Sequence, residues 1–231
     1  MEQLKFKKNT LVLSGDKMFE TVQGEGPSIG QPAVFMRLQY CNLRCVWCDT
    51  KYSWSHDVEM EEVTLDETVK RLNKFQVRRL VITGGEPLLQ MKSIEKLIDR
   101  LKGWVFEVET NGTVMPSPKI IRNCQINMSP KLSNSKMDKK IRLNNEIYRS
   151  LSDKKNVFFK FVVDSAEDIK EVKELIDGTG IKSSQVVIMP QGIDSEEIRA
   201  KMLILVELVK KEGWRLLPRL QVYLWGRKRR V

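Results

Sequence analysis

Three cysteines stand within eight residues of this chain, in the stretch Cys41-Asn-Leu-Arg-Cys45-Val-Trp-Cys48. Three thiolates on one short loop bind a soft metal well, but they do not fill four coordination positions. An iron–sulfur cube normally takes four cysteine thiolates, so a cube held by three keeps one iron open to a small molecule. The spacing therefore predicts an iron–sulfur centre that takes part in chemistry.

Two other uses of these cysteines stay open. A zinc loop usually has a second pair of Cys or His ligands about 12 to 20 residues away, and the chain offers only His56 and Cys124. Redox thiols or a disulfide are less well supported, because no export signal indicates an oxidising compartment. We interpret Cys124 as a buried strand thiol, since free cysteines are commonly buried.

Length and charge limit the class of protein. The chain of 231 residues is 41% hydrophobic, and we expect it to form a single domain over residues 1–231. No apolar run reaches the about 18 residues that span a bilayer, so we expect a cytoplasmic protein without a membrane segment. The net charge of +10 includes the run Arg227-Lys228-Arg229-Arg230. Without an RNA-binding motif, this charge favours a solvated surface or an acidic partner over nucleic acid.

Strands alternate with amphipathic helices along the chain, which is typical of parallel βαβ units. Helices are expected to begin near Thr64 and Ser165, each followed by an acid three residues later, and to end near Gly178 and Gly213. Residues 195–212 predict a long final helix. The predicted strands are short and rich in β-branched or aromatic residues, and they cover residues 33–39, 79–83, 105–109, 125–128, 157–163 and 185–189.

Glycine-rich and polar segments follow several of these strands. Parallel strands open their carboxyl ends on one edge, where α/β sites assemble, so these segments should lie beside the cysteine loop. The glycines of the first segment would let the backbone approach a ligand, although a tight strand-to-helix connection is the alternative. The segments are Thr83-Gly84-Gly85-Glu86-Pro87, Glu109-Thr110-Asn111-Gly112-Thr113 and Ser129-Pro130-Lys131.

Two features closer to the N-terminus suit a polar heterocycle. Gln23-Gly24-Glu25-Gly26-Pro27 combines flexible backbone with an amide and an acid, which suits a donor and acceptor edge; a hairpin turn is the alternative. Arg37 lies on the strand that enters the cysteine loop. If its guanidinium faces the interior of the site, it would suit a substrate carboxylate. Exposure on the other face of the sheet is equally compatible with the sequence.

Together these motifs resemble the radical S-adenosylmethionine superfamily. Within it, the chain is similar over nearly its whole length to the 7-carboxy-7-deazaguanine synthase family, through residues 19–26, 48–50, 82–87, 109–113, 129–131 and 220–225. That family converts 6-carboxy-5,6,7,8-tetrahydropterin into 7-carboxy-7-deazaguanine and ammonia, on the route to queuosine and related deazapurines. The resemblance implies a partial TIM-type (β/α)6 barrel of the radical SAM type, with the cluster at its carboxyl-end mouth, and a homodimer.

The resemblance also implies roles for individual residues. Cys41, Cys45 and Cys48 would hold a [4Fe–4S] cluster that binds S-adenosylmethionine, and a low-potential donor such as flavodoxin would supply the electron for its cleavage. Gln221 and Tyr223 stand where family members often have a His, so the role of the C-terminal segment stays open. The implied contacts are Trp47, Gly85, Ser129, Pro130 and Lys131 for S-adenosylmethionine, Val22, Gln23, Gly24, Arg37 and Thr83 for the substrate, and Thr50 for Mg²⁺.

Two other functions stay open at this point. A glycyl-radical enzyme activase has a similar length and cysteine spacing, although the Gln-Gly-Glu-Gly and Cys-Asp-Thr matches argue against it. From a different class, a non-catalytic iron–sulfur or zinc-binding module would use the basic surface to hold RNA. Cleavage of S-adenosylmethionine by the reconstituted protein would separate an enzyme from such a module.

Overall fold

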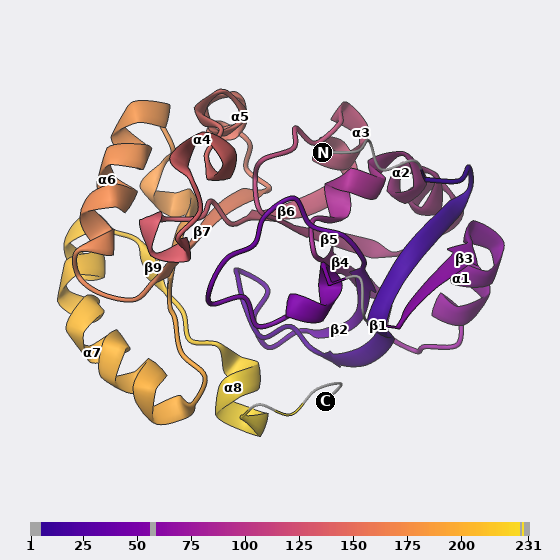
Figure 1. The fold of residues 1–231 in the computed structure, drawn as a ribbon, viewed down its shortest axis with the longest axis horizontal. Coiled ribbons are helices and arrows are strands. Elements are labelled where there is room, and N and C mark those ends of the chain that lie inside the picture. Colours follow the sequence, from indigo (N-terminus) through magenta and orange to yellow (C-terminus); the bar gives the residue numbers. More distant parts are fainter. Residues whose placement is uncertain (1–5, 56–58, 227, 229–231) are drawn as a thin grey trace.

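Six buried strands form the centre of the molecule, in the positions that the sequence predicts to within about one residue at each end. The computed structural model describes residues 6–55, 59–226 and 228 (Figure 1). The strands lie parallel, in chain order, and a two-residue strand β9 (Arg215–Leu216) extends them at one edge. They are β2 (Pro32–Leu38), β4 (Arg79–Gly84), β5 (Val105–Thr110), β6 (Cys124–Met128), β7 (Val157–Val163) and β8 (Val186–Pro190).

Two strands that the sequence analysis missed extend the sheet at its other edge. β1 (Thr10–Val22) pairs antiparallel with β2, and β3 (Met60–Thr64) pairs antiparallel with β1. The order of strands in the nine-stranded sheet is β3-β1-β2-β4-β5-β6-β7-β8-β9. Because β3 and β9 do not pair with each other, the sheet stays open, and the predicted partial barrel is an unclosed one (Figure 1).

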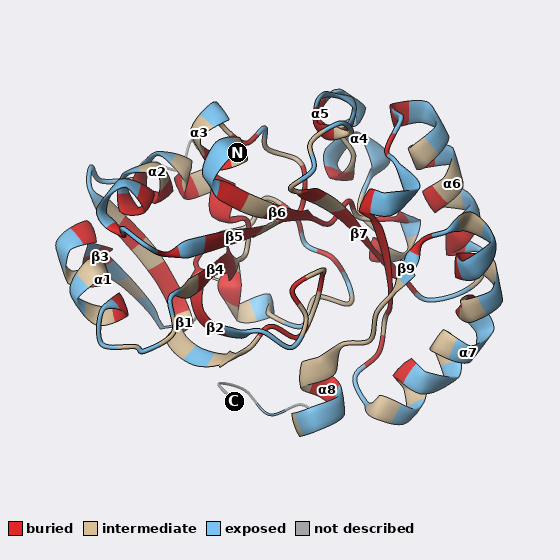
Figure 2. Ribbon diagram, turned by 180° about the vertical axis from the view of Figure 1, so that it is seen from behind, coloured by how far each residue is buried: buried red, intermediate tan, exposed pale blue. Residues whose placement is uncertain are grey.

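Helices connect the parallel strands and pack their apolar sides against the sheet, whose central strands are mostly buried (Figure 2). One large cluster of aliphatic and aromatic side chains forms the core between them. The helices are α1 (Leu65–Leu72), α2 (Met91–Arg100), α3 (Pro118–Asn123), α4 (Lys139–Arg142), α5 (Asn145–Leu151), α6 (Asp168–Thr179), α7 (Ser195–Glu212) and α8 (Leu220–Trp225). Short 3-10 turns are η1 (Lys51–Ser53), η2 (Pro87–Gln90), η3 (Ser133–Ser135) and η4 (Ser183–Gln185).

The helix ends follow the sequence in part. Thr64 caps α1 as predicted, because its hydroxyl accepts a hydrogen bond from the Glu67 N–H at 3.2 Å. The predicted start at Ser165 is wrong: α6 begins at Asp168, whose carboxylate accepts from the Ser165 N–H. The end at Gly178 is also wrong, because the left-handed residue that ends α6 is Gly180, with φ +74°.

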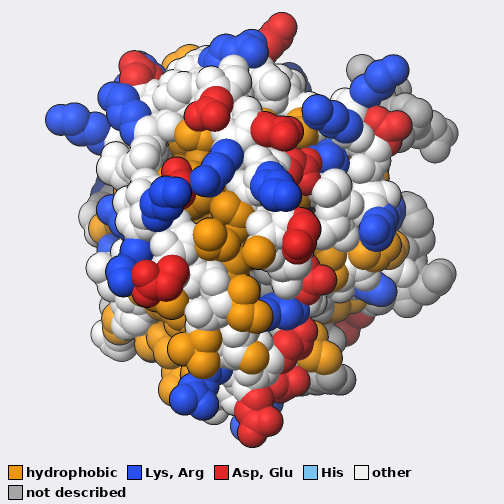
Figure 3. All heavy atoms as spheres, turned by 90° about the vertical axis from the view of Figure 1, so that its left-hand side faces the viewer, with side chains coloured by type: hydrophobic (Ala, Val, Ile, Leu, Met, Phe, Trp, Pro, Cys, Tyr) orange, Lys and Arg blue, Asp and Glu red, His pale blue; other side chains and the backbone are white. Residues whose placement is uncertain are grey.

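The long helix α7 has the predicted bounds and ends at the left-handed Gly213, but α8 follows it, so it is not the final helix. Its outer face exposes Leu203 and Ile204. Figure 3 views the side of the molecule where α6 and α7 lie and shows apolar side chains among charged ones. Within the described ranges, the length and apolarity needed to cross a membrane are not found together in any helix.

Gly84, the last residue of β4, and Gly85, which follows it, are required by the protein's own backbone. Hydrogen bonds from the Gly85 N–H to the Leu38 carbonyl (3.0 Å) and from the Glu86 N–H to the Tyr40 carbonyl (2.7 Å) continue the β2–β4 ladder past the ends of the strands. Gly84 has φ +138°, and a Cβ there would lie 2.1 Å from the Leu38 carbonyl oxygen. The sequence predicted that these glycines let a ligand come close to the backbone. In the structure, the backbone of Leu38 and Tyr40, which leads into the cysteine loop, makes that close contact.

We predict that Gly84→Ala lowers the free energy of unfolding by about 3 kcal/mol, because the methyl group meets fixed backbone at a dihedral angle that alanine avoids. Gly178→Ala is the matched control. Gly178 lies inside α6, and a Cβ there would meet no other atom within 4 Å, so alanine at this position should raise stability by about 0.5–1 kcal/mol. Urea unfolding followed by circular dichroism measures both; equal effects of the two changes would contradict this account.

Candidate functional site

A cavity of about 580 Å³ lies at the carboxyl ends of the parallel strands. This volume is typical of sites for small molecules and cofactors. Pro130 is buried and is not among the lining residues, whereas Ser129 and Lys131 on either side of it are. The other predicted site residues all line the cavity: Val22, Gln23, Gly24, Arg37, Cys41, Cys45, Trp47, Cys48, Thr50, Thr83, Gly85, Ser129 and Lys131.

The cysteine loop is held by the segment that follows β6. The Val46 N–H donates to the Ser135 carbonyl at 3.2 Å, and the Trp47 indole N–H donates to Asn134 Oδ1 at 3.1 Å. Lys131 Nζ lies 5.4 Å from the centre of the Trp47 ring, an arrangement that allows a cation–π interaction. Burial raises the pKa of the Cys41 thiol to about 11. The loop thus presents three thiols in a partly dry setting.

These thiols fit a cluster. All are free, and all line the one cavity. Across residues 6–55, 59–226 and 228, no three His, Cys, Asp or Glu side chains are grouped as ligands of a single metal ion. Three cysteine sulfurs that line one cavity match the donor set of an iron–sulfur cube with one open iron.

The two candidate partners for a zinc loop lie elsewhere. His56 lies outside the described residues. Cys124 begins β6, at the end of the strand away from the cavity, and is 2% exposed within the core. Burial raises the pKa of its thiol to about 12. The prediction of a buried strand thiol at this position is confirmed.

Glu86 is a structural residue of the site that the sequence analysis left without a role. Its carboxylate is fully buried and accepts hydrogen bonds from the Thr110 hydroxyl (2.8 Å), the Asn111 N–H (2.7 Å) and the Leu88 N–H (3.0 Å). Burial raises the pKa of this carboxyl to about 7, and the three donors oppose that shift. Glu86 therefore ties the turn after β4 to the segment after β5.

Gln23 lines the cavity, but its side-chain amide forms hydrogen bonds within the protein. Its side-chain nitrogen donates to Glu107 Oε2 (3.2 Å) and Glu109 Oε1 (3.3 Å), and its side-chain oxygen accepts from the Glu25 N–H (3.1 Å). Thr83 Oγ1 donates to the other oxygen of Glu109 at 2.8 Å. The prediction that this amide reads a heterocycle stays untested, and Glu109 is the carboxylate that the network presents at the cavity.

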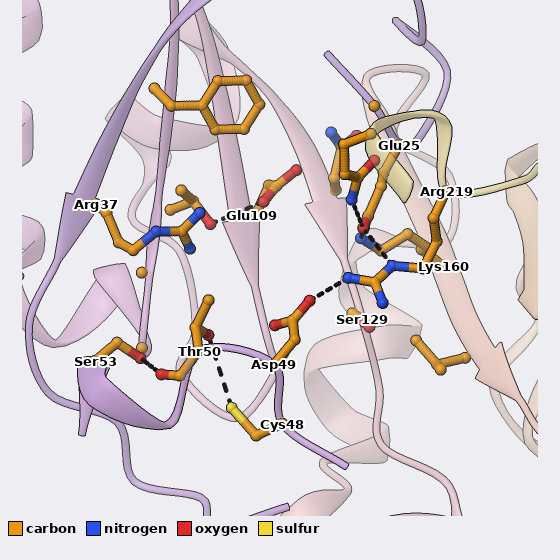
Figure 4. Close-up of a pocket in the computed structure, with 18 of the residues that line it drawn as sticks. Glu25, Arg37, Cys48, Asp49, Thr50, Ser53, Glu109, Ser129, Lys160 and Arg219 are labelled. Carbon is orange, nitrogen blue, oxygen red and sulfur yellow. Dashed lines mark hydrogen bonds and ion pairs between the residues drawn. The ribbon is translucent and has the colours of Figure 1, made fainter. Parts of the chain in front are cut away.

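Arg37 lines the cavity, so its side chain is on the interior face of β2 rather than on the opposite face. Figure 4 shows its guanidinium across the cavity from a group of charged residues that includes Glu25, Lys160 and Arg219. The interior orientation is one of the two that the sequence left open. Its role toward a carboxylate stays a prediction.

The charged group is a network that the sequence analysis did not assemble. Glu25 pairs with Lys160 and with Arg219, whose Nε lies 3.2 Å from Glu25 Oε1, and Gln221 Nε2 donates to the same oxygen at 2.7 Å. Arg219 also pairs with Asp49. Burial works to lower the pKa of Lys160, but the neighbouring carboxylates outweigh it and raise that pKa. In the sequence, the sign of this network was Lys160, a charged residue inside the otherwise apolar strand β7 (Val157–Val163).

Gln221 and Gly24 fit each other closely: a Cβ at position 24 would lie 1.9 Å from Gln221 Oε1. Tyr223, in contrast, is 40% exposed and is not among the lining residues. In the basic run after α8, only Lys228 is described, and it lines the cavity; Arg227, Arg229 and Arg230 lie outside the described residues.

Thr50 stands at the start of η1, yet its hydroxyl makes no capping hydrogen bond there. The Thr50 carbonyl takes that role and accepts from the Ser53 N–H (2.8 Å) and the Ser53 hydroxyl (2.7 Å). The Thr50 hydroxyl faces the cavity, 3.7 Å from Cys48 Sγ (Figure 4). An oxygen donor beside the cysteine loop is the kind of group that Mg²⁺ prefers.

Comparison with known proteins agrees with this geometry. Residues 37–200 match the model of the radical SAM superfamily. A 7-carboxy-7-deazaguanine synthase from Pyrobaculum aerophilum is 36% identical, over 92% of this chain and 95% of its own length, and one from Rhodopirellula baltica is 34% identical, over 91% and 86%. The crystal structure of QueE from Escherichia coli is 25% identical with a TM-score of 0.71, and the match covers 95% of this chain and 99% of that chain. The chain belongs to the radical SAM superfamily and, within it, to the 7-carboxy-7-deazaguanine synthase family.

Proposed function

We propose that this protein converts 6-carboxy-5,6,7,8-tetrahydropterin into 7-carboxy-7-deazaguanine and ammonia, as a carbon–nitrogen lyase. One observation supports the proposal most directly: three free thiols line the same cavity as Arg37 and Thr83. The chain also belongs to the family that has this activity. We also propose that residues 1–231 act as a single domain, because one sheet includes strands from Thr10 to Leu216. A homodimer rests on the family resemblance alone.

In this proposal Cys41, Cys45 and Cys48 hold a [4Fe–4S] cluster, which together with S-adenosylmethionine supplies one-electron chemistry when bound. Gly85, Trp47, Ser129 and Lys131 line the cavity near those thiols and would contact S-adenosylmethionine. Pro130 would act by shaping the turn between two of these contacts. The chain's own part is to orient the reactants and exclude water, because the cofactor carries the chemistry.

The substrate would lie between Arg37 and the network around Glu25. Lys160 and Arg219 already face carboxylates at short distance, so their charges are largely matched within the protein. Arg37 lines the same cavity on its other side, and the family resemblance assigns it to the substrate carboxylate, which a guanidinium can hold through a bidentate hydrogen bond. Val22, Gln23 and Gly24 would bound the pterin ring, with Thr83 and Glu109 supplying polar contacts.

We infer that an acidic low-potential carrier, such as a flavodoxin, delivers the electron beside the cysteine loop. Val46 is 54% exposed next to Cys45, and the neighbouring segment carries the exposed Lys136 and Lys139. The Val46 and Arg44 N–H groups bond to Ser135 and Met137 on either side of Lys136. Positive charge close to the cluster would speed encounter with an anionic protein.

An anaerobic assay tests the proposed function. The reconstituted protein, with reductant, S-adenosylmethionine, Mg²⁺ and the carboxytetrahydropterin, should release the deazaguanine, detected by mass. Changing any one of Cys41, Cys45 or Cys48 to Ala should abolish cluster assembly and turnover, whereas Cys124→Ala should keep both, because Cys124 lies in the core. An intact cluster without product would overturn the substrate assignment, and a protein that cannot cleave S-adenosylmethionine would be a binding module instead.

Thr50→Ala should lower activity and weaken its dependence on Mg²⁺, while S-adenosylmethionine still binds. The reason is that the Thr50 hydroxyl faces the cavity, and the turn is capped by its carbonyl instead. Thr50→Ser, which keeps the hydroxyl, is the matched control and should retain the Mg²⁺ response. The measurement is the rate as a function of Mg²⁺ concentration; an unchanged response in Thr50→Ala would remove the metal assignment.

Turnover supported by a flavodoxin should fall with added salt far more than turnover supported by dithionite, because the Debye length shrinks to about 8 Å at physiological ionic strength. The Lys136→Glu and Lys139→Glu double variant should cut the flavodoxin-supported rate at low salt by about tenfold and leave the dithionite rate unchanged. Lys211→Glu, an exposed change at the end of α7 away from the cavity, is the control. Equal salt sensitivity with both reductants would refute the docking surface.

A further inference from the structure

One arginine in the segment that follows β9 contacts three other parts of the molecule. Arg219 is only 13% exposed along its side chain. Its Nε faces Glu25 at 3.2 Å, its Nη1 donates to the Gly192 carbonyl at 3.0 Å, and its Nη2 pairs with Asp49. Figure 4 shows the guanidinium between the Glu25 and Asp49 carboxylates. The three partners come from three different loops.

The guanidinium suits this junction because it is planar and presents five N–H donors in a fixed fork. Lysine would offer a compact charge that reaches one of these partners well and the others poorly. The Leu220 N–H adds a backbone hydrogen bond to the Gly24 carbonyl, at 3.0 Å, immediately after Arg219. The start of α8 is thereby joined to both the β1–β2 connection and the cysteine loop.

The two carboxylates do not depend on Arg219 to the same degree. Glu25 also binds Lys160 and Gln221, so it keeps partners if the guanidinium is lost. For the Asp49 carboxylate, Arg219 is the single hydrogen-bonding or ion-pairing partner found among the described residues. Asp49 lies between Cys48 and Thr50 in the chain, and its side chain is 52% exposed. Loss of Arg219 therefore removes the side-chain anchor of this part of the loop and leaves it to the hydrogen bonds from Ser53 to the Thr50 carbonyl and from the Cys48 N–H to the Cys45 carbonyl.

We propose that Arg219 is a positioning residue that acts through Asp49 and fixes Cys48 and Thr50 more firmly while the segment 217–226 is seated against the cavity. If a ligand displaces this segment as it enters or leaves, the contact between Arg219 and Asp49 breaks. The cysteine loop then becomes more mobile around Cys48 and Thr50. The kinetic part of this proposal rests on the proposed function; the structural part does not.

Hydrogen exchange of the full-length chain, before and after cluster reconstitution, tests the structural part. In Arg219→Lys and in Asp49→Asn, peptides that cover residues 45–53 should exchange about tenfold faster, because local opening becomes easier without global unfolding. The melting temperature should change little. Arg199→Lys, an exposed change on α7, is the matched control and should leave exchange at wild-type rates.

Kinetics and a double variant complete the test. Each single change should raise the Mg²⁺ concentration needed for half-maximal rate. Arg219→Lys combined with Asp49→Asn should be no worse than Arg219→Lys alone, since both changes remove the contact between Arg219 and Asp49. Wild-type exchange at residues 45–53 in both single variants, or additive effects in the double variant, would overturn the proposal. If Arg219→Lys fails to fold, Asp49→Asn examines the same contact from the exposed side. A wild-type protein that makes no deazaguanine would refute the proposed function without altering the exchange result.

Discussion

The site depends on the ladder between β2 and β4. Two backbone hydrogen bonds beyond the strand ends, from Gly85 to Leu38 and from Glu86 to Tyr40, place the first cysteine of the motif at the mouth of the cavity. Side chains at positions 84 and 85 would collide with that backbone, so the pair of glycines is a condition for the cysteine loop to start where it does. Glu86 then extends the same support to β5 through its buried hydrogen bonds.

The parallel strands could be predicted because each is short and most are rich in β-branched or aromatic residues, which leaves a strong local pattern. β1 could not be predicted as easily, since its pairing register shifts between Leu13 and Met18 and breaks the alternation of apolar residues. The cysteines, the turn after β4 and the segments after β5 and β6 are local motifs, and the expectation that they share one cavity is confirmed. Their ligand contacts remain predictions.

The network of Glu25, Lys160 and Arg219 could not be predicted from the sequence, for a different reason. Glu25 meets Lys160 and Arg219 across separations of 135 and 194 residues, and no local pattern encodes such pairs. The same limit applies to Gln23, whose amide looked available for a ligand until its partners Glu107 and Glu109 were known. A buried carboxylate or lysine in an apolar strand indicates that a partner exists, because an unpaired charge there is costly, but it does not identify the partner.

The hydrogen bond between Leu220 and Gly24 has a consequence for the order of assembly. A chain emerging from the ribosome can bury most of its parallel sheet while the segment 217–226 is still inside the exit tunnel. The cavity wall formed by Arg219, Gln221 and Val222 is absent until that segment emerges. The cysteines are thus made early in translation, whereas the last part of the wall that encloses them is made about 170 residues later, so the cavity is completed only after the rest of the sheet has been synthesised.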